Sequence, residues 1–433
     1  MAVADSVSVF AEGTFEEQIQ ELVNYIVRNR PEEERATFIR PFQDALKTEG
    51  GQKRIDEDED RRRKTISMVI SEVKGVGDGN EKEIEGFFNL IYSHFLTLYS
   101  TDSPEAKKHL ETISKAVQSA PSEQNFIKYR VLSNLFNALP RSSPLRLSIY
   151  RTLLDIATSN DQIDALQLSR ADVNTWLAEW DVSQEEKSAF TKSIADAYAK
   201  SDQLASSYGY SLSYLQSLPS SSPESQAAAI DVIATALRLP NVFDFDALFK
   251  IDAVVASKDH ELFSLLQVFL SGGLADFKSW ESSHSGVLAK YSMSLCTRLE
   301  RRAPDILAPD LEQSQLEHKI KLLTLASLGF KNVGQNLSYA AIAEALQVDI
   351  SEVEKWVIDV IRAGLLWGKL SQTKQTLHIT RSTARTFERE QWEALEKRLL
   401  AWKSGLSGVL EVVANARRQG GAHPPSQAAP VST

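Results

Sequence analysis

The feature that most constrains the fold is a switch of hydrophobic period within residues 316–381. Three stretches with helical spacing come first: LEHKIKLLTLASLGF, SYAAIAEALQV and SEVEKWVIDVIRAG. In the third, apolar side chains recur at i, i+3, i+4, i+7 and i+8, which predicts an amphipathic helix; they are Val353, Trp356, Val357, Val360 and Ile361. Apolar and polar residues then alternate on both sides of the polar turn 372–375, which predicts a β-hairpin.

Local signals indicate where these helices begin and end. Ser338 is placed to cap the second helix, and Ser351 with Glu354 is placed to form a capping box at the third. Gly364 follows the third helix, where a residue with positive φ is favoured. Three short helices followed by a two-stranded wing form a winged helix, which we predict for residues 316–380.

The charge of the third helix argues against a role in DNA recognition. Residues 349–362 carry four acids and two bases, which are Asp349, Glu352, Glu354, Asp359, Lys355 and Arg362. A helix that enters the major groove approaches phosphates, and an acidic helix is repelled by them. The formal net charge of −10 is equally atypical of a general nucleic-acid binder. We therefore predict that the winged helix docks proteins.

The preceding part of the chain has the pattern of stacked helices. From 82 to 218, apolar sets with helical spacing follow one another, separated by short turns and without strand signals. With only 19 Gly and 14 Pro in 433 residues, long helices are favoured over turn-rich β structure. No strict repeat consensus is present. We predict an all-α chain, in which an α-solenoid of degenerate repeats ends in the winged helix and a long C-terminal helix.

Breaks in the pattern suggest the domain organisation. The clearest local break is SLPSSSPES at 217–225, after which Ser222 and Pro223 are placed to restart a helix. We predict N-terminal helical repeats over 1–206, further repeats over 207–315, and the winged helix over 316–380. A C-terminal helix over 381–417 and a disordered tail of Gly, Pro, Ser and Ala over 418–433 complete the chain.

The C-terminal helix carries a continuous apolar seam. Its members alternate spacings of three and four, as in a heptad pattern; they are Trp392, Leu395, Leu399, Trp402, Leu406, Val409 and Val413. Gly405 and Gly408 lie inside the helix and weaken it by up to ~1 kcal/mol each relative to Ala. Such a helix needs a second surface. We favour a bundle with partner helices. Packing of this helix against its own chain is the alternative that the sequence leaves open.

Two charged features have both a functional and an ordinary explanation. Arg381, Arg385 and Arg389 recur every four residues, so on a helix starting near Ser382 they share one face. They could contact RNA phosphates or an acidic partner, or simply be solvated. The block RIDEDEDRRRK at 54–64 could be a contact loop, but its balanced charge favours a solvated loop leading into a helix.

The sequence contains no motif that predicts catalysis. No two of the seven histidines lie within five residues of each other, so no local metal-binding spacing exists. Gly75, Gly77 and Gly79 do not match a phosphate-binding loop and follow no predicted strand. Cys296 is the single cysteine, which excludes disulfides within the chain and fits a small buried apolar residue. We predict no enzymatic activity, no cofactor and no metal.

Targeting signals are equally absent. The N-terminus lacks a basic segment followed by an apolar run, so no signal peptide is predicted. No apolar stretch approaches the ~20 residues that a membrane-spanning helix needs. We expect a soluble, cytoplasmic protein that does not bind membranes.

Helical repeats that lead into a winged helix and a long terminal helix resemble the PCI-domain proteins. These are scaffolding subunits of the proteasome lid, the signalosome and eukaryotic translation initiation factor 3. The stretch ELFSLLQVFLSGGLADFKSW at 261–280 resembles the paired helices before the wing. The stretches at 318–332 and 341–380 are most similar to one PCI subunit of the initiation factor. The clear resemblance spans 207–380 and is weaker over the N-terminal half.

The resemblance implies a non-catalytic scaffold subunit that supports assembly on the small ribosomal subunit and recruitment of mRNA and initiator methionyl-tRNA. In this family, winged helices pack edge to edge and terminal helices gather in a bundle. We therefore expect other PCI subunits to contact the seam and the wing, the latter through Leu366, Leu370, Leu377 and Ile379. A subunit of the signalosome or proteasome lid is the alternative. Direct contact with nucleic acid stays open.

Overall fold

The computed structural model describes residues 13–28, 30–47, 53–220, 222–284, 286, 313–386 and 389–420. Contacts divide the chain into two compact units, Met1–Ala228 and Ala229–Thr433. This division lies inside one helix near the serine-rich break, whereas the sequence predicts a boundary at 206/207. We describe each unit by itself.

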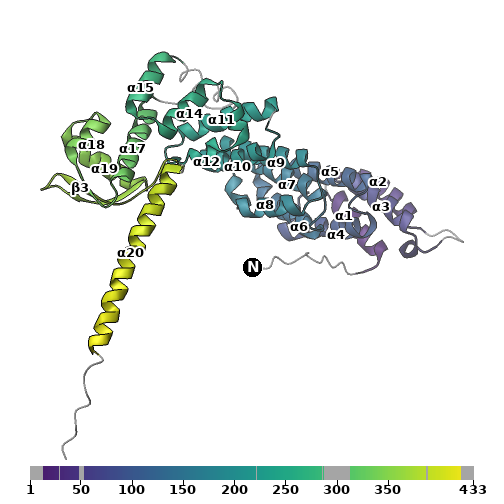
Figure 1. The fold of residues 1–433 in the computed structure, drawn as a ribbon. Coiled ribbons are helices and arrows are strands. Elements are labelled where there is room, and N and C mark those ends of the chain that lie inside the picture. Colours follow the sequence, from purple (N-terminus) through teal and green to yellow (C-terminus); the bar gives the residue numbers. More distant parts are fainter. Residues whose placement is uncertain are drawn as a thin grey trace, which may run out of the picture. The chain divides into compact units, whose positions relative to one another are not determined.

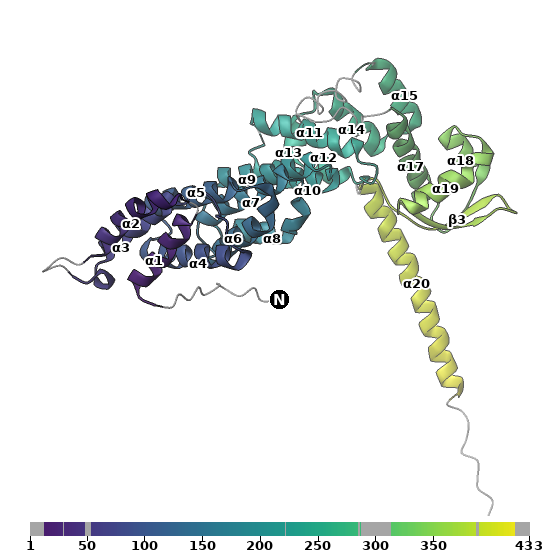
Figure 2. The same cartoon turned by 180° about the vertical axis from the view of Figure 1, so that it is seen from behind.

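Unit 1 is helical throughout its described residues. Its α-helices are α1 (Phe15–Val27), α2 (Glu32–Leu46), α3 (Glu59–Glu72), α4 (Glu81–Leu98), α5 (Pro104–Gln118), α6 (Asn125–Ala138), α7 (Leu145–Ser159), α8 (Arg170–Glu179), α9 (Gln184–Lys200) and α10 (Leu204–Ser217). Short 3₁₀ turns connect some of them, namely Ile55–Glu57, Ser122–Gln124 and Ile163–Leu166. Figures 1 and 2 show these helices stacked in chain order.

Each helix of unit 1 packs mainly against helices close to it in sequence. α4 contacts α6, α5 contacts α7, α7 contacts α9, and α9 contacts α10. Such nearest-neighbour packing defines a solenoid, because each added pair of helices buries the apolar face left by the pair before it. The predicted stack of helices is therefore confirmed.

Polar caps and an aromatic core fix the individual helices. The capping box of Ser183 with Glu186 at the start of α9 is confirmed. Trp180, only 1% exposed, lies just after α8. Its ring is within 6.2 Å of a group of aromatic rings, which belong to Phe136, Trp176 and Phe190. This cluster joins α6, α8 and α9.

The charged block at 54–64 leads into helix α3 as predicted, but its first residues form an ordered 3₁₀ turn rather than a loop, and the helix already begins at Glu59. Ile55 is buried, and the side chain of Asp58 accepts a hydrogen bond from the backbone of Arg61 at the N-terminus of α3. The Arg61 guanidinium donates to the carbonyls of Ala45 and Lys47 at 3.0 and 2.9 Å. The Asp58 carboxylate thus caps the N-terminus of α3, where acidic residues are favoured. The Arg61 guanidinium satisfies carbonyls at the end of α2 that lack partners within the helix.

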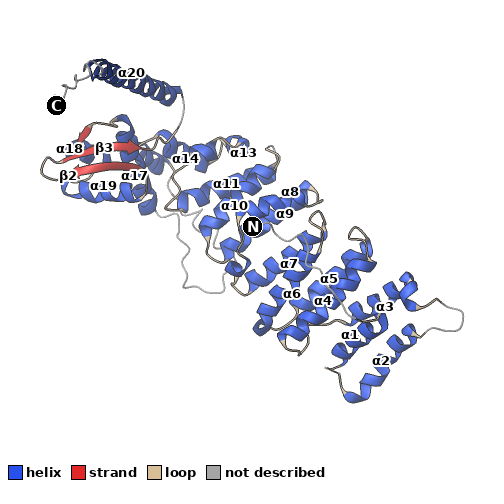
Figure 3. Cartoon of the chain, turned by 90° about the horizontal axis from the view of Figure 1, so that it is seen from below, coloured by secondary structure: helices blue, strands red, loops and turns tan. Residues whose placement is uncertain are grey.

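Unit 2 combines a few further solenoid helices with the winged helix. Its helices are α11 (Pro223–Arg238), which begins in unit 1, α12 (Asp246–Phe249), α13 (Asp252–Ala256), α14 (Glu261–Ser271), α15 (Leu274–Ser283), α17 (Gln313–Lys331), α18 (Tyr339–Leu346), α19 (Val353–Arg362) and α20 (Arg389–Gly420). Its strands are β1 (Asn336–Ser338), β2 (Leu366–Ser371) and β3 (Thr376–Ser382). Figure 3 shows the strands beside α17, α18 and α19.

The winged helix is confirmed, with one strand more than predicted. The sheet is antiparallel in the order β1-β3-β2, and Leu337 of β1 pairs with Leu377 of β3. A strand of three residues is too short to show a period of two, which is why the sequence predicted only two strands. α17 packs so closely on the sheet that a Cβ at Gly329 would lie 2.5 Å from the side chain of Leu366.

Two of the three predicted helix-end signals are confirmed. The Ser338 side chain accepts from the backbone of Ala341, and Gly364 has φ +70°. The capping box of Ser351 with Glu354 is wrong, because a 3₁₀ turn at Ile350–Glu352 comes before α19. The Glu354 carboxylate instead accepts a hydrogen bond from the Tyr339 hydroxyl at 3.2 Å.

A buried lysine fastens the winged helix to the solenoid helices of unit 2. Lys319 of α17 is 3% exposed, and its ammonium donates to the carbonyls of Ala236 and Leu239 at 2.7 and 2.8 Å. These carbonyls lie at the end of α11, where a cation is favoured. The Phe245 ring lies 4.9 Å away. Burial lowers the pKa of Lys319 to about 7, while the carbonyl acceptors favour the charged form.

We predict that Lys319→Met destabilises the protein by about 2 to 4 kcal/mol, because buried carbonyls lose their donor. Urea unfolding followed by circular dichroism measures this loss. Lys331→Met, at the exposed end of the same helix, is the matched control and is expected to change little. Equal losses in both variants would show that the carbonyl contacts contribute nothing.

We also predict a loss of stability on the acid side from His94 of α4. Its buried Nε2 has no hydrogen-bond partner in the described chain, and burial followed by the charge of Arg62 lowers its pKa from 6.5 to about 4. The unfolded chain therefore binds a proton that the native chain rejects as pH falls from about 7 towards 4. Wild type should lose up to about 3 kcal/mol relative to His94→Leu over this range. A constant difference between the two unfolding curves across these pH values would contradict the assignment.

Candidate partner-binding surfaces

The apolar seam of α20 lies in solvent. Its predicted members are 38% to 66% exposed, which applies to Trp392, Leu395, Leu399, Trp402, Leu406, Val409 and Val413. Further exposed apolar residues, Leu400, Leu410 and Val412, are 57% to 68% exposed. The described chain does not cover this surface. A helix with this much exposed apolar area is typical of an element that is completed by another molecule.

α20 begins at Arg389, not near Ser382 as predicted, because the chain first continues strand β3 and then a fixed linker. The Ser382 hydroxyl donates to the Ala326 carbonyl at 2.8 Å. The backbone of Thr383 donates to the Leu365 carbonyl at 2.9 Å. These contacts hold the segment before α20 against α17 and the wing.

Arg385 forms the strongest part of this anchor. Its guanidinium donates to the Gly272 carbonyl at 2.6 Å, to the Leu323 carbonyl at 2.9 Å and to the Thr324 hydroxyl at 3.3 Å. These acceptors belong to the end of α14 and to α17. Burial lowers the pKa of Arg385 to about 10, so the side chain stays charged at neutral pH.

The prediction that three arginines share one helix face is therefore wrong. Arg381 is exposed on β3, Arg385 is partly buried in the segment before α20, and Arg389 forms an ion pair with Glu393 at 2.9 Å in the first turn of α20. A spacing of four aligns side chains only on a continuous helix, and here the helix covers only Arg389. Of the three, only Arg381 is presented on the wing.

The predicted apolar contacts of the wing are also mostly wrong. Leu366, Leu377 and Ile379 are 0% exposed, because they form the inner face of the sheet against the winged-helix core. Leu370 is 37% exposed and stays available. β2 is an edge strand of the described sheet, so its backbone edge, rather than these side chains, is the feature that a neighbour can use.

The structure refines the charge argument on α19. Two of its acids are engaged within the domain, since the Glu354 carboxylate accepts a hydrogen bond from the Tyr339 hydroxyl and the Asp359 carboxylate lies 3.8 Å from the His318 ring.

Two isoleucines that the sequence analysis did not identify are exposed. Ile350 is 50% and Ile358 is 43% exposed. Apolar residues outside the amphipathic stripe were the available signal.

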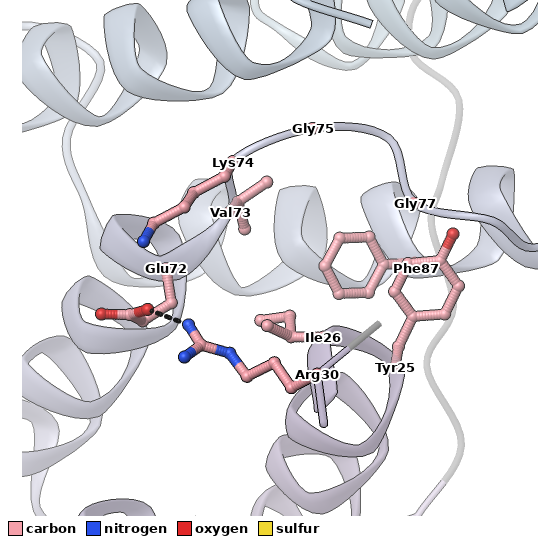
Figure 4. Close-up of a pocket in the computed structure, with 9 residues that line it drawn as sticks. All are labelled: Tyr25, Ile26, Arg30, Glu72, Val73, Lys74, Gly75, Gly77 and Phe87. Carbon is pink, nitrogen blue, oxygen red and sulfur yellow. Dashed lines mark hydrogen bonds and ion pairs between the residues drawn. The ribbon is translucent and has the colours of Figure 1, made fainter. Parts of the chain in front are cut away.

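A cavity of about 420 Å³ in unit 1 was not predicted. Figure 4 shows its lining, in which the Arg30 guanidinium pairs with Glu72 at 2.9 Å and the rings of Tyr25 and Phe87 stack at 4.3 Å. Gly77 has φ +82°, and a Cβ there would lie 2.7 Å from the Tyr25 hydroxyl, so glycine is required. The cavity can accept a side chain of a partner, but its two paired charges offer no catalytic acid and base.

Side chains that could ligate a metal are dispersed over the described residues. Across those ranges, no group of three or more His, Cys, Asp or Glu side chains could hold a metal ion. None of the helices that the structure describes is long and apolar enough to cross a membrane. Cys296 and the predicted disordered tail lie outside the described residues, apart from the tail's first three positions, which belong to α20.

Comparison with known families places these surfaces in context. Residues 304–381 match the PCI domain, which covers the winged helix. Residues 385–413 match the description "eIF3 subunit M, C-terminal helix". The second match coincides with the Arg385 anchor and the exposed seam of α20.

Curated relatives match almost the whole chain. The chain is 32% identical to eukaryotic translation initiation factor 3 subunit M of Emericella nidulans, over 96% of this chain and 91% of the relative. It is 30% identical to the subunit M proteins of Neosartorya fischeri and Aspergillus terreus, over 96% of this chain and 88% and 89% of theirs. The chain therefore belongs to the family of eukaryotic translation initiation factor 3 subunit M.

Proposed function

We propose that the chain is a non-catalytic scaffold subunit of the eukaryotic translation initiation factor 3 complex, and that it acts in the cytoplasm. In this role it supports assembly on the small ribosomal subunit and recruitment of mRNA and initiator methionyl-tRNA. The observation that carries the proposal is the exposed apolar seam of α20, in the segment that matches the C-terminal helix of subunit M.

The composition of α20 explains why it needs partner helices. Most helical stability in proteins comes from packing of an apolar face, and here that face is exposed. Gly405 and Gly408 reduce the intrinsic stability further. Spacings of three and four along the seam suit knobs-into-holes packing against other helices. Helices of neighbouring subunits are the occupants that fit this pattern.

The segment before the seam supports the scaffold role because residues 382–385 are held against the winged helix. Arg385 spans the end of α14 and the middle of α17 with charge-assisted hydrogen bonds. Ser382 and Thr383 add contacts to α17 and to the residue before β2. A partner that binds α20 is thereby held close to the winged helix.

The edge of β2 offers a second docking feature. An unpaired strand edge presents backbone N–H and C=O groups that a strand of a neighbouring PCI subunit can pair with. Leu370, at 37% exposure, lies on this strand and can contact the added strand. We propose that the wing meets a neighbouring subunit through this edge, and that contact with the ribosomal subunit occurs through the complex.

We predict that Leu399→Asp with Trp402→Ala reduces incorporation into the complex by tenfold or more, roughly the effect of losing hot-spot contacts. Both side chains are more than half exposed, so the isolated chain should keep its fold and unfolding midpoint. Co-sedimentation with the other subunits measures incorporation.

The matched control for this experiment is Lys397→Ala with Ser404→Ala. These residues are exposed on the same turns of α20 but lie on the side of the helix opposite to the seam. If the seam variant enters the complex as well as the control variant, the seam is not the docking surface.

We further predict that the tagged full-length chain co-purifies with subunits of the initiation factor and with the small ribosomal subunit, as identified by mass spectrometry. Co-purification with signalosome or proteasome-lid subunits, without ribosomal proteins, would instead support the alternative assignment within the PCI family.

A further inference from the structure

The outer face of the wing sheet carries polar and basic side chains around one tryptophan. Leu366, Leu377 and Ile379 are buried against the core, so the residues that alternate with them point away from it. The β-bulge beside Trp367 shifts the register by one residue, which lets the consecutive residues Thr380 and Arg381 both be exposed. Those on the outer face are exposed, and they are Asn336, Trp367, Lys369, His378, Thr380 and Arg381. We call these six residues the wing face.

The strand register brings the members of the wing face together. Lys369 of β2 and Asn336 of β1 both pair with His378 of the central strand β3. The ring of His378 lies within hydrogen-bond distance of the Asn336 side chain, at 2.9 Å. The wing face therefore extends across all three strands of the described sheet.

Trp367 and Arg381 form the second part of the face. They are cross-strand partners next to a β-bulge, and the Arg381 guanidinium lies 4.6 Å from the centre of the Trp367 ring. The Thr380 hydroxyl donates to the Trp367 carbonyl at 3.0 Å. Trp367 is nevertheless 38% exposed, so an aromatic surface stays accessible beside a fixed cation.

The wing differs in charge from the rest of the chain. Its sequence from 363 to 387 contains no Asp or Glu, in a protein with a formal net charge of −10. Within the described part of the chain, Lys369, Lys374 and Arg381 form no ion pair with a carboxylate. Glu354 of α19 accepts a hydrogen bond from the Gln372 side chain at 3.4 Å, so this carboxylate lies at the turn rather than on the wing face.

We propose that the wing face binds single-stranded RNA, with a base stacked on Trp367 and phosphates near Lys369, Arg381 and the turn residue Lys374. An aromatic platform beside basic groups is typical of proteins that bind unpaired bases, and every base has a surface that can stack. Asn336 and Thr380 supply the neutral polar groups that can contact sugar and base edges. An acidic peptide would use the cations but would leave the tryptophan without a stacking partner.

This site goes beyond the proposed scaffold role and does not depend on it. Arg385 and Arg389, which the sequence analysis grouped with Arg381, take no part, because Arg385 donates to the Leu323 and Gly272 carbonyls and Arg389 is paired with Glu393. A subunit held in an assembly on the ribosome could thus contact an RNA strand with the side of the wing opposite to its own core.

The proposal can be tested on the purified full-length chain without any partner subunit, so a failure to assemble would not affect the result. The probe is a fluorescein-labelled twelve-nucleotide oligouridine, and the measurement is fluorescence anisotropy. Because three cations face the phosphates, the affinity should fall about 15-fold between about 50 mM and about 200 mM salt. Trp367→Ala should weaken binding by about 5-fold to 100-fold, and Trp367→Phe should largely restore it.

The matched control is Phe126→Ala with Lys107→Gln, an exposed aromatic and an exposed basic residue of unit 1 outside the wing, which should bind the RNA like wild type. Unfolding curves of all variants exclude a loss of fold. Absence of RNA binding by wild type, or equal binding by Trp367→Ala, would overturn the proposal. If polyglutamate binds as tightly as the RNA and is equally weakened by Arg381→Gln, an acidic protein takes this surface instead.

Discussion

The contact on which unit 2 depends is the ammonium of Lys319 against the end of α11. The last carbonyls of a helix lack partners within the helix, and here a side chain from a helix about 80 residues away in sequence satisfies them. The same contact places α17, and α17 in turn supports the sheet through Gly329 and the linker through Arg385. The position of the winged helix relative to α11 and α14 therefore rests on two cations that bind backbone carbonyls, the buried Lys319 and the partly buried Arg385.

Cations at helix ends recur elsewhere in the chain. Arg61 serves the end of α2, and Arg385 reaches the residue after α14. In stacked helices, many helix ends lie close to a neighbouring turn, and a long basic side chain can reach carbonyls that water would otherwise satisfy. This explains why several bases of an acidic protein are directed inward, whereas those of the wing face are exposed.

Much of the fold follows from sequence because helical periodicity is long and redundant. The solenoid helices, the winged helix and the Ser338 cap required only local patterns. Features set by tertiary contacts were missed. Lys319 lies on the apolar stripe of its helix, between Leu316 and Ile320, so its position was visible but its partner was not. The prediction that Leu366, Leu377 and Ile379 contact a partner was wrong for another reason. Alternation identifies the two faces of a strand but does not say which one faces the core.

Exposed apolar residues of α20 are not confined to one seam. Leu400 and Val412 lie away from the heptad positions, yet both are more than half exposed. A helix with apolar residues on several sides fits an interior place in a bundle, surrounded by more than one neighbour. A molecule made in excess of its partners would carry this whole surface into solvent, where it invites aggregation or recognition by quality-control factors. Under the proposed role, the amount of free subunit would then depend on the supply of partner helices that can enclose α20.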